Sequence, residues 1–422
     1  MNYISTRNHL HSLSLSEAMQ QGLASDGGLF LPEQMPIIDE PLALSNKTYA
    51  EFSYVLLKDF FKTDELAHSL MAICERAFQS PIPLKQLNKN TFVLELFHGP
   101  TSSFKDFGAL FLAECLSGTN NKKKTILVAT SGDTGSAVAS AFYRKPNYKV
   151  VILYPEGQVS VKQEQQMTCW RENIFAFAVN GNFDQCQQLV KSAFQDPLCS
   201  SSTELSSANS INIGRLLPQI SYYAYTSLQF YKNNQQKPGF IIPSGNLGNA
   251  TAAYWAKAMG FPIRAIVLAT NTNRVISDYL NSGIYQARPS IKTIANAMDV
   301  GNPSNLERLH HLFSSFTSFK ENVQSISAND CIINQTISDV YKQYGYISCP
   351  HTATAFYSRN QLDKQPWIVV ATADPCKFDQ IIEPIIHVKV PIAPQLQRLL
   401  DKPQRFFRME ANLNALRKVL NE

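Results

Sequence analysis

Short, continuously apolar runs recur along the chain, and each is followed by a turn rich in Gly, Ser, Thr or Asn and then by a helix-like segment. This alternation is typical of βαβ units, in which neighbouring strands are parallel. Because the runs are apolar at nearly every position, both faces of each strand should be covered by helices. The sequence therefore predicts the α/β class, with strands at 125–129, 150–154, 240–242, 265–269 and 368–371.

Changes in pattern predict three regions within the 422 residues. Helix-like periodicity over 49–78, followed by Pro81 and Pro83, predicts a mostly helical amino-terminal cap over 1–90. A polar stretch at 232–238 precedes a new strand and predicts a link between two α/β lobes, 91–235 and 236–422. The amphipathic stretch 410–420 predicts a terminal helix that docks on the protein.

Composition and charge exclude several classes of partner. The net charge is +5, but the basic residues are scattered and do not form the stripe that nucleic acid requires. The eight cysteines include no Cys-x-x-Cys pair, which is typical of buried thiols in a reducing compartment. No stretch is long enough to span a bilayer, and residues 1–20 lack the apolar core of a signal peptide. We therefore expect a cytoplasmic protein with no nucleic-acid or membrane partner.

Two of the strand-turn-helix junctions have glycine turns that suit anions. They read ATSGDTGSAVASAF at 129–142 and IPSGNLGNATAAYWAKAMG at 242–260. A glycine turn lets backbone N–H groups converge, and the following helix adds its positive end. The same glycines could simply make tight turns. The chain has no G-x-G-x-x-G and no P-loop, so a bound phosphate would belong to something other than a nucleotide.

Lys105 opens an apolar, helix-like run within the segment LELFHGPTSSFKDFGALFLAECL at 94–116. The apolar content implies burial, and burial favours the neutral amine, the form that condenses with an aldehyde. Alternatively, Lys105 extends to the surface and pairs with Asp106. His98 and His351 are either pocket residues or structural ones. The adjacent His310 and His311 have no nearby cysteine or carboxylate cluster, so no metal site is expected.

Six motifs resemble, in order, those of the threonine synthases in their long bacterial and fungal form: HGPTSSFKDFG, TSGDTGSA, SSANSINIGR, PSGNLGN, NAMDVGNPSN and ATADPCKF. The segment SLSEAMQQGLASDGGLFLP resembles the amino-terminal signature of that family. The resemblance implies a fold of the tryptophan-synthase-β type, in which pyridoxal 5'-phosphate (PLP) lies in the cleft between two α/β lobes.

The resemblance also implies roles for individual residues. Lys105 would be the Schiff-base lysine and the proton shuttle. Thr372 would meet the pyridine nitrogen, unless it merely ends a strand. Arg215 suits a substrate phosphate because a guanidinium binds phosphate oxygens bidentately. The asparagines near it could instead have a structural role, in which they hydrogen-bond to backbone groups of the loop. The implied cofactor-binding set is Lys105, Asp133, Ser244, Gly245, Asn246, Leu247, Gly248, Asn249 and Thr372, and the substrate-phosphate set is Ser131, Thr134, Asn209, Ser210 and Arg215.

The implied reaction converts O-phospho-L-homoserine and water to L-threonine and phosphate, by γ-elimination and hydration at Cβ. Two alternatives stay open: a PLP lyase on the same scaffold, acting on O-phosphohomoserine or on serine and threonine, and a degenerate PLP-fold binding protein. The partner would be a small-molecule substrate, and the protein a monomer or a homodimer. Leu247, Asn249 and Asp374 replace an aromatic residue, an acid and a histidine of the family pattern, so Asp374 would add negative charge near the cofactor ring or the substrate.

Overall fold

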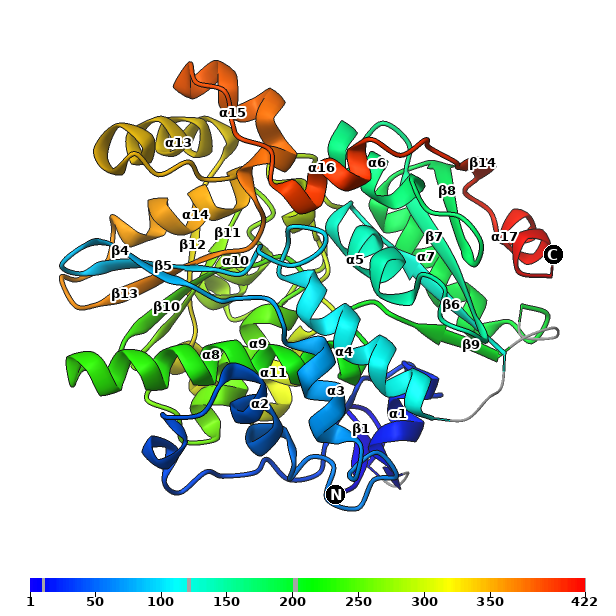
Figure 1. The fold of residues 1–422 in the computed structure, drawn as a ribbon, viewed down its shortest axis with the longest axis horizontal. Helices are drawn as coiled ribbons and strands as arrows, with labels where there is room; N and C mark the ends of the chain where they lie inside the picture. Colours follow the sequence, from blue (N-terminus) through cyan, green and yellow to red (C-terminus); the bar gives the residue numbers. More distant parts are fainter. Residues whose placement is uncertain (10–11, 120–122, 200–203, 422) are drawn as a thin grey trace.

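Two mainly parallel sheets form the body of the molecule (Figure 1). The computed structural model describes residues 1–9, 12–119, 123–199 and 204–421. One sheet has the order β14-β8-β7-β6-β9 and is parallel throughout; the other has the order β12-β11-β10-β13-β5-β4, in which only β4 is antiparallel to its neighbour. The predicted α/β class is confirmed.

All five apolar runs are strands, as predicted. In the five-stranded sheet lie β6 (Lys124–Ala129), β7 (Tyr148–Pro155), β8 (Ile174–Asn180), β9 (Glu204–Ser207) and β14 (Phe407–Glu410). The six-stranded sheet contains β4 (Leu84–Asn88), β5 (Thr91–Glu95), β10 (Gly239–Pro243), β11 (Ile266–Thr270), β12 (Gln324–Ser327) and β13 (Trp367–Ala371). The central strands β10, β13 and β5 are buried along their whole length, because helices cover both faces.

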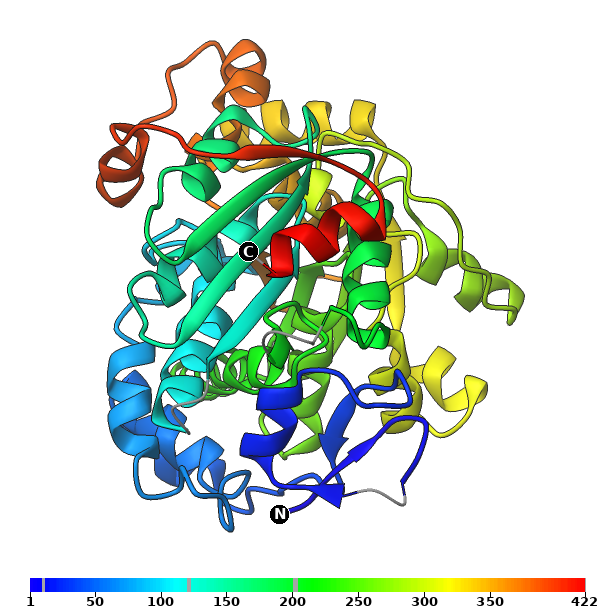
Figure 2. The ribbon, with the colours of Figure 1, turned by 90° about the vertical axis from the view of Figure 1, so that its right-hand side faces the viewer.

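The amino-terminal region is mostly helical, as predicted, but it also has strands that the sequence does not indicate. It contains a small antiparallel sheet of β1 (Tyr3–Ser5), β2 (Ser12–Leu13) and β3 (Phe30–Pro32). Strands of two or three residues are too short to show alternation, so the sequence gives no sign of them. The helices of this region are α1 (Leu15–Gln21), η1 (Pro41–Leu44), α2 (Tyr49–Leu57) and α3 (Leu70–Ala77). Figure 2 shows the region along one side of both lobes.

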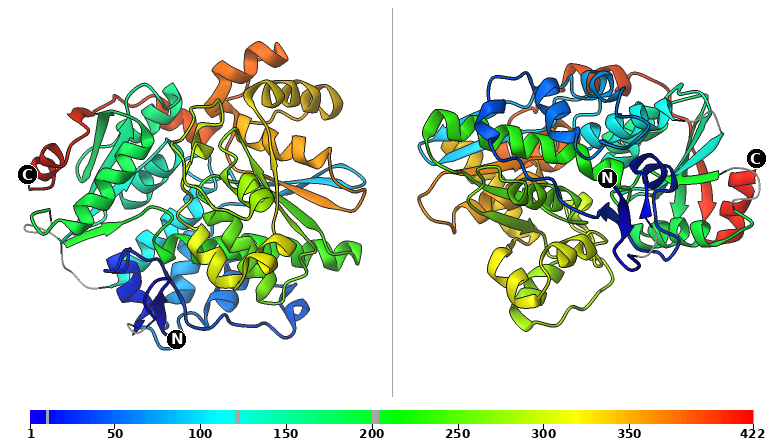
Figure 3. Two further views of the ribbon diagram at one scale, coloured as in Figure 1. Left: turned by 180° about the vertical axis from the view of Figure 1, so that it is seen from behind. Right: turned by 90° about the horizontal axis from the view of Figure 1, so that it is seen from below.

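The chain passes between the two sheets more often than the predicted boundary at residue 235 allows. Strand β5 precedes that boundary but pairs with β13, and β14 follows it but pairs with β8. The sheets therefore do not coincide with 91–235 and 236–422: β5, which is buried at every position, lies inside one sheet, and the mostly exposed β14 lies at the edge of the other. Figure 3 shows the carboxyl-terminal segment returning to the five-stranded sheet.

Helices fill the space between and around the sheets. Within the five-stranded lobe, α17 (Leu413–Asn421) buries Leu416 and Leu420, so the predicted docking helix is present. The remaining helices are α4 (Lys105–Gly118), α5 (Asp133–Phe142), α6 (Val161–Thr168), α7 (Phe183–Gln195), α8 (Ile213–Asn234), α9 (Gly248–Ala258), α10 (Val275–Ser282), η2 (Asn296–Met298), α11 (Leu306–Leu312), α12 (Phe316–Asn322), α13 (Asp330–Tyr344), α14 (Pro350–Arg359), η3 (Pro375–Phe378), α15 (Asp379–Ile386) and α16 (Pro394–Leu400).

Helices α4 and α8 approach each other closely at Gly108. A Cβ at this position would lie 2.7 Å from the Arg215 carbonyl oxygen and 2.9 Å from Arg215 Nε. Only glycine permits this contact without a shift of backbone. The close packing places Lys105, at the start of α4, and Arg215, in the first turn of α8, beside the same space. Among the described residues, no helix is long and apolar enough to cross a membrane.

Candidate active site

A pocket lies between the two lobes, where β6, β10 and β13 end in loops. This is the edge at which open parallel sheets usually bind ligands. Every residue that the sequence assigns to the cofactor or to the substrate phosphate lines it: Lys105, Ser131, Asp133, Thr134, Asn209, Ser210, Arg215, Ser244, Gly245, Asn246, Leu247, Gly248, Asn249 and Thr372. The structure therefore brings both predicted sets together in one cavity.

A tight turn places Lys105 at the pocket. Asp106 accepts hydrogen bonds from the backbone N–H of Thr101 at 2.9 Å and from its hydroxyl at 2.6 Å. The Phe104 N–H donates to the Thr372 carbonyl at 2.9 Å, and the Asp374 N–H donates to the Ser102 carbonyl at 3.0 Å. The turn is thus fixed to the end of β13, which sets Lys105 beside Thr372.

The Lys105 amine lies in the pocket, so the alternative of a surface lysine paired with Asp106 is wrong. Burial lowers the pKa of Lys105 to about 8, although Asp133 raises it; Arg215 and Lys377 lower it further. A lysine with such a pKa has a substantial neutral fraction near physiological pH. The neutral amine is the form that can attack an aldehyde or accept a proton.

The shape of the loop at 244–249 is fixed by its backbone conformation and by contacts with neighbouring segments. Leu247 has a left-handed φ of 62° and leads into α9, whose first turn has backbone N–H groups without helical partners. Gly245 lies against Met298, where a Cβ would fall 2.8 Å from the Met298 Cα. The Asn246 amide donates to Ser210 Oγ at 2.7 Å, and its oxygen accepts the Ser304 N–H at 2.6 Å. The Asn246 side chain thus braces the loop.

Asn249 is held by two tyrosines. Its Oδ1 accepts hydrogen bonds from the hydroxyls of Tyr222 at 2.5 Å and Tyr223 at 2.8 Å. Its Nδ2 is buried and has no partner among the described residues. The amide that replaces the acid of the family pattern therefore accepts hydrogen bonds from both tyrosines.

Arg215 is the buried cation of the pocket. Its Nη1 donates to the Ala208 carbonyl, while its Nε is buried without a partner among the described residues. Burial lowers the pKa of Arg215 to about 10, so the guanidinium remains charged at neutral pH. Asn209, in contrast, uses both ends of its amide on the Ala129 backbone, at 3.2 and 2.6 Å. Asn209 therefore has the structural contacts that an asparagine in a loop commonly makes.

Asp133 and His351 complete the electrostatics of the pocket. Asp133 accepts hydrogen bonds from Lys377 at 2.7 Å and from Gln163 at 2.9 Å. Burial opposes its ionisation, but Lys377, His351 and Gln163 outweigh burial and hold the Asp133 pKa below its usual value. Burial lowers the pKa of His351 to about 4, so this ring is neutral, and its Nε2 accepts the Ala297 N–H at 3.1 Å.

Asp374 lies outside the set of residues that line the pocket. Its carboxylate accepts the Cys376 N–H at 2.9 Å and caps η3. The expectation that it adds negative charge near the cofactor ring or the substrate has no support in this geometry, because a cap fixes the carboxylate on its own turn.

Arg308 is a supporting residue that the sequence does not reveal. It is fully buried and donates to the carbonyls of Phe30, Ser210 and Ile211 and to the Asn305 side chain, at 2.7 to 3.2 Å. Phe30 belongs to the amino-terminal sheet, whereas Ser210 lines the pocket. Arg308 thus connects the amino-terminal region to the pocket wall. It follows the motif NAMDVGNPSN by three residues, and this proximity is the one signal that could have pointed to it.

Comparison with known families agrees with this site. Residues 77–372 match the model of the pyridoxal-phosphate dependent enzymes, so the chain belongs to that class. Residues 2–78 match the threonine synthase N terminus, and residues 351–420 match the threonine synthase C-terminal region. The chain is a member of the threonine synthase family, as its motifs predict.

Individual relatives match over most or all of their length. Threonine synthase of Escherichia coli (strain K12) is 37% identical over 429 residues, which cover 100% of this chain and 99% of that protein. Threonine synthase of Schizosaccharomyces pombe is 32% identical, and the match covers 90% of this chain and 88% of that protein. The crystal structure of the E. coli enzyme superposes with a TM-score of 0.95 at 36% identity, covering 100% and 99%. The crystal structure of PLP-bound threonine synthase from Brucella melitensis superposes with a TM-score of 0.91 at 32% identity, and the match covers 100% of this chain and 99% of that one.

Replacement of Arg308 by lysine should destabilise the protein. A lysine ammonium cannot reach the four acceptors that the guanidinium satisfies, and buried carbonyls would lose their donors. We expect Arg308→Lys to lower the free energy of unfolding by about 2–4 kcal/mol, measured by chemical denaturation. Arg288→Lys, at a half-exposed ion pair with Asp278, should change it by less than about 1 kcal/mol. Equal effects of the two variants would contradict the supporting role of Arg308.

Proposed function

We propose that the protein is a threonine synthase that converts O-phospho-L-homoserine and water to L-threonine and phosphate. One observation carries the proposal: a pocket between the lobes combines an enclosed lysine of lowered pKa, an amide-rich turn and a buried arginine with a free donor. These are the groups that a phosphorylated cofactor and a phosphorylated substrate require together. We also propose that the protein acts in the cytoplasm, as a monomer or a homodimer; its eight cysteines are free thiols.

The groups that line the pocket fit pyridoxal phosphate. An amine is present for its aldehyde, and the turn Ser244 to Asn249 at the start of α9 offers backbone N–H groups for its phosphate. Thr372 would meet the pyridine nitrogen with its hydroxyl, and Asp133 would lie on the side of the ring. Bound there, pyridoxal phosphate supplies an electron sink that stabilises negative charge at the substrate Cα.

Lys105 would hold the cofactor and then move protons. Its neutral amine would remove the proton at the substrate Cα and would transfer protons at Cβ and at the cofactor carbon C4′. A pKa near 8 suits both directions of transfer, because neither the charged nor the neutral amine is strongly favoured near neutral pH.

Arg215 would hold the substrate phosphate and stabilise it as it leaves from Cγ. Charge grows on the phosphate as the bond breaks, so a fixed cation binds the transition state more tightly than the substrate. Ser131 and Thr134, at the start of α5, and Ser210, whose hydroxyl accepts from Asn246, would add neutral donors. Asn209 would act less directly, because its amide is engaged by the Ala129 backbone.

Product analysis tests the proposed reaction. Purified, PLP-loaded protein incubated with O-phosphohomoserine should release phosphate and threonine in equal amounts, with little 2-oxobutyrate. Lys105→Ala should lose the absorbance of the lysine-bound cofactor and all turnover. Phosphate accompanied mainly by 2-oxobutyrate would indicate a phospho-lyase, and no phosphate release at all would indicate a binding protein. Retention of the absorbance band in Lys105→Ala would contradict the role of that lysine.

A substitution at Arg215 should reduce turnover as well as substrate binding. Loss of one charge-assisted contact to the phosphate corresponds to a fall in kcat/KM of roughly 10- to 100-fold for Arg215→Gln. Arg215→Lys should recover part of the loss, since it keeps the charge. Arg144→Gln, which changes an exposed arginine paired with Glu172, serves as the control. A rise in KM with unchanged kcat would count against phosphate stabilisation in the transition state.

A further inference from the structure

Lys377 is a fully buried cation that does not line the pocket. It belongs to η3, and its side chain is 0% exposed. Its Nζ lies 2.7 Å from Asp133 Oδ1 and 2.9 Å from the Thr101 carbonyl oxygen. Burying an ion pair requires removal of water from two charges, and this cost is rarely recovered as stability alone. Both contacts lead to the pocket, because Asp133 lines it and Thr101 opens the turn to Lys105.

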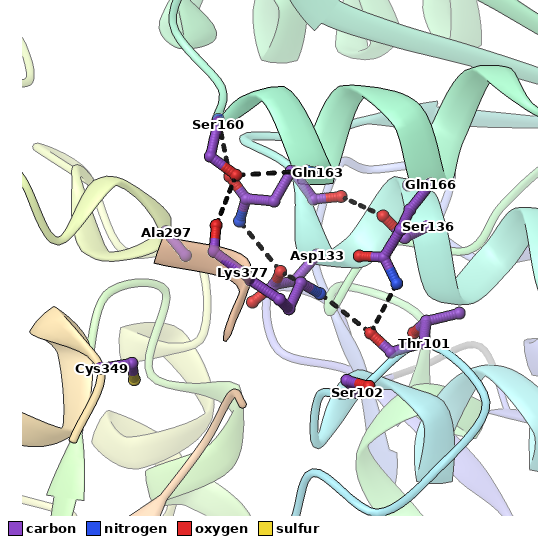
Figure 4. Close-up of polar contacts among 12 residues, drawn as sticks. Thr101, Ser102, Asp133, Ser136, Ser160, Gln163, Gln166, Ala297, Cys349 and Lys377 are labelled. Atoms are coloured by element: carbon purple, nitrogen blue, oxygen red, sulfur yellow. Dashed lines mark hydrogen bonds and ion pairs between the residues drawn. The ribbon is translucent and has the colours of Figure 1, made fainter. Parts of the chain in front are cut away.

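The surrounding polar groups join the two lobes at this point (Figure 4). From α6, Gln163 donates to Asp133 at 2.9 Å and Gln166 donates to the Thr101 carbonyl at 3.0 Å. The Ser160 hydroxyl, at the start of the same helix, donates to the Lys377 carbonyl at 2.9 Å. Lys377 and Thr101 follow strands of the six-stranded sheet, whereas Asp133 and α6 belong to the other lobe. Lys377 therefore takes part in the contact between the lobes through both its side chain and its carbonyl.

We propose that Lys377 is a positioning residue, which keeps the Asp133 carboxylate charged beside the Lys105 amine and fixes the turn that presents Lys105. The proposal rests on the proposed function through the role of Lys105. It assigns Lys377 no contact with cofactor or substrate.

The charges around Asp133 explain why Lys377 is needed. The titratable or charged groups that interact with the carboxylate are Lys377, His351, the Cys349 thiol and the Lys105 amine, and Gln163 donates a hydrogen bond to it. His351 is neutral, since burial lowers its pKa to about 4, and Gln163 carries no charge. Without Lys377, the buried carboxylate would lose its close cation, and desolvation would raise its pKa. Asp133 would then take up a proton at a pH where the native protein keeps it ionised.

The ionisation of Asp133 has a consequence for Lys105. Asp133 raises the Lys105 pKa, whereas Arg215 and Lys377 lower it, and the effect of Asp133 is the largest of these three. If Asp133 became protonated, the Lys105 amine would lose its main electrostatic support. The pair of Asp133 and Lys377 thus supplies two of the three charges that act on Lys105, and Arg215 supplies the third.

The test is a pH titration of the absorbance of PLP-loaded protein, from about pH 5 to about pH 9. Compared with the native protein, Lys377→Met should show one additional ionisation, from Asp133. The added ionisation should be absent from Lys377→Arg, which keeps the cation, and from Lys377→Met combined with Asp133→Asn, which lacks the carboxylate. Lys162→Met is a matched control, because Lys162 also donates to a carbonyl of η3, that of Cys376, but pairs with Asp379. It should give the native profile.

Several outcomes would overturn the proposal. A native profile for Lys377→Met, or an added ionisation that persists without the Asp133 carboxylate, would show that Lys377 does not control Asp133. If Lys377→Met does not fold, the double variant should fold, because it leaves no unpaired buried charge; failure of both, with Lys162→Met folded, would reduce Lys377 to a structural residue. An absorbance band that survives in Lys105→Ala would instead refute the proposed role of Lys105. This measurement therefore distinguishes failure of the Lys377 proposal from failure of the proposed function.

Discussion

The attachment of one turn to the end of a central strand organises the site. The Phe104 N–H and the Ser102 carbonyl bond to Thr372 and Asp374, just beyond β13, and Asp106 closes the turn by binding Thr101. These backbone contacts set Lys105 beside Thr372 without using either functional side chain. The lysine can therefore be enclosed and still point into the pocket, where burial gives it a pKa of about 8. Asp133, Arg215 and the loop at 244–249 line the same pocket as that amine.

The path of the chain explains why the two lobes hold the pocket in common. Strand β5 lies beside β13 in one sheet, while β14 returns to the other sheet near the end of the chain. Each lobe is thus built from segments distant in sequence, and contacts such as that of Lys377 with Asp133 join them at the pocket. The amino-terminal region is attached in the same way, through Arg308 and the carbonyls of Phe30 and Ser210. Three parts of the chain therefore determine the position of a few side chains.

Sequence patterns predict the parts of this structure whose signal is local. Continuous apolar runs identify β6, β7, β10, β11 and β13, and every residue that the motifs assign to the cofactor or to the substrate phosphate lines the pocket. Short edge strands such as β9 and β14 escape prediction, because four half-polar residues have no distinctive pattern. The predicted lobe boundary at residue 235 does not match the sheets for a related reason. The parallel partner of β5 is β13, about 270 residues away, and pairing at that distance leaves no trace in local composition.

The supporting charges could not be predicted either. Lys377 lies within the motif ATADPCKF, and Arg308 lies three residues beyond NAMDVGNPSN, but neither motif indicates complete burial, which results from contacts between distant segments. Asp374 illustrates the opposite error, since proximity in sequence to Thr372 suggests a place at the ring, but the carboxylate caps η3.

The central claim is that Lys105 holds the cofactor, and covalent mapping tests it most directly. PLP-loaded protein would be reduced with borohydride, digested and analysed by mass spectrometry for the modified peptide. The account predicts a single pyridoxyl label on Lys105. A label on Lys377 or another lysine, with Lys105 unmodified, would contradict it.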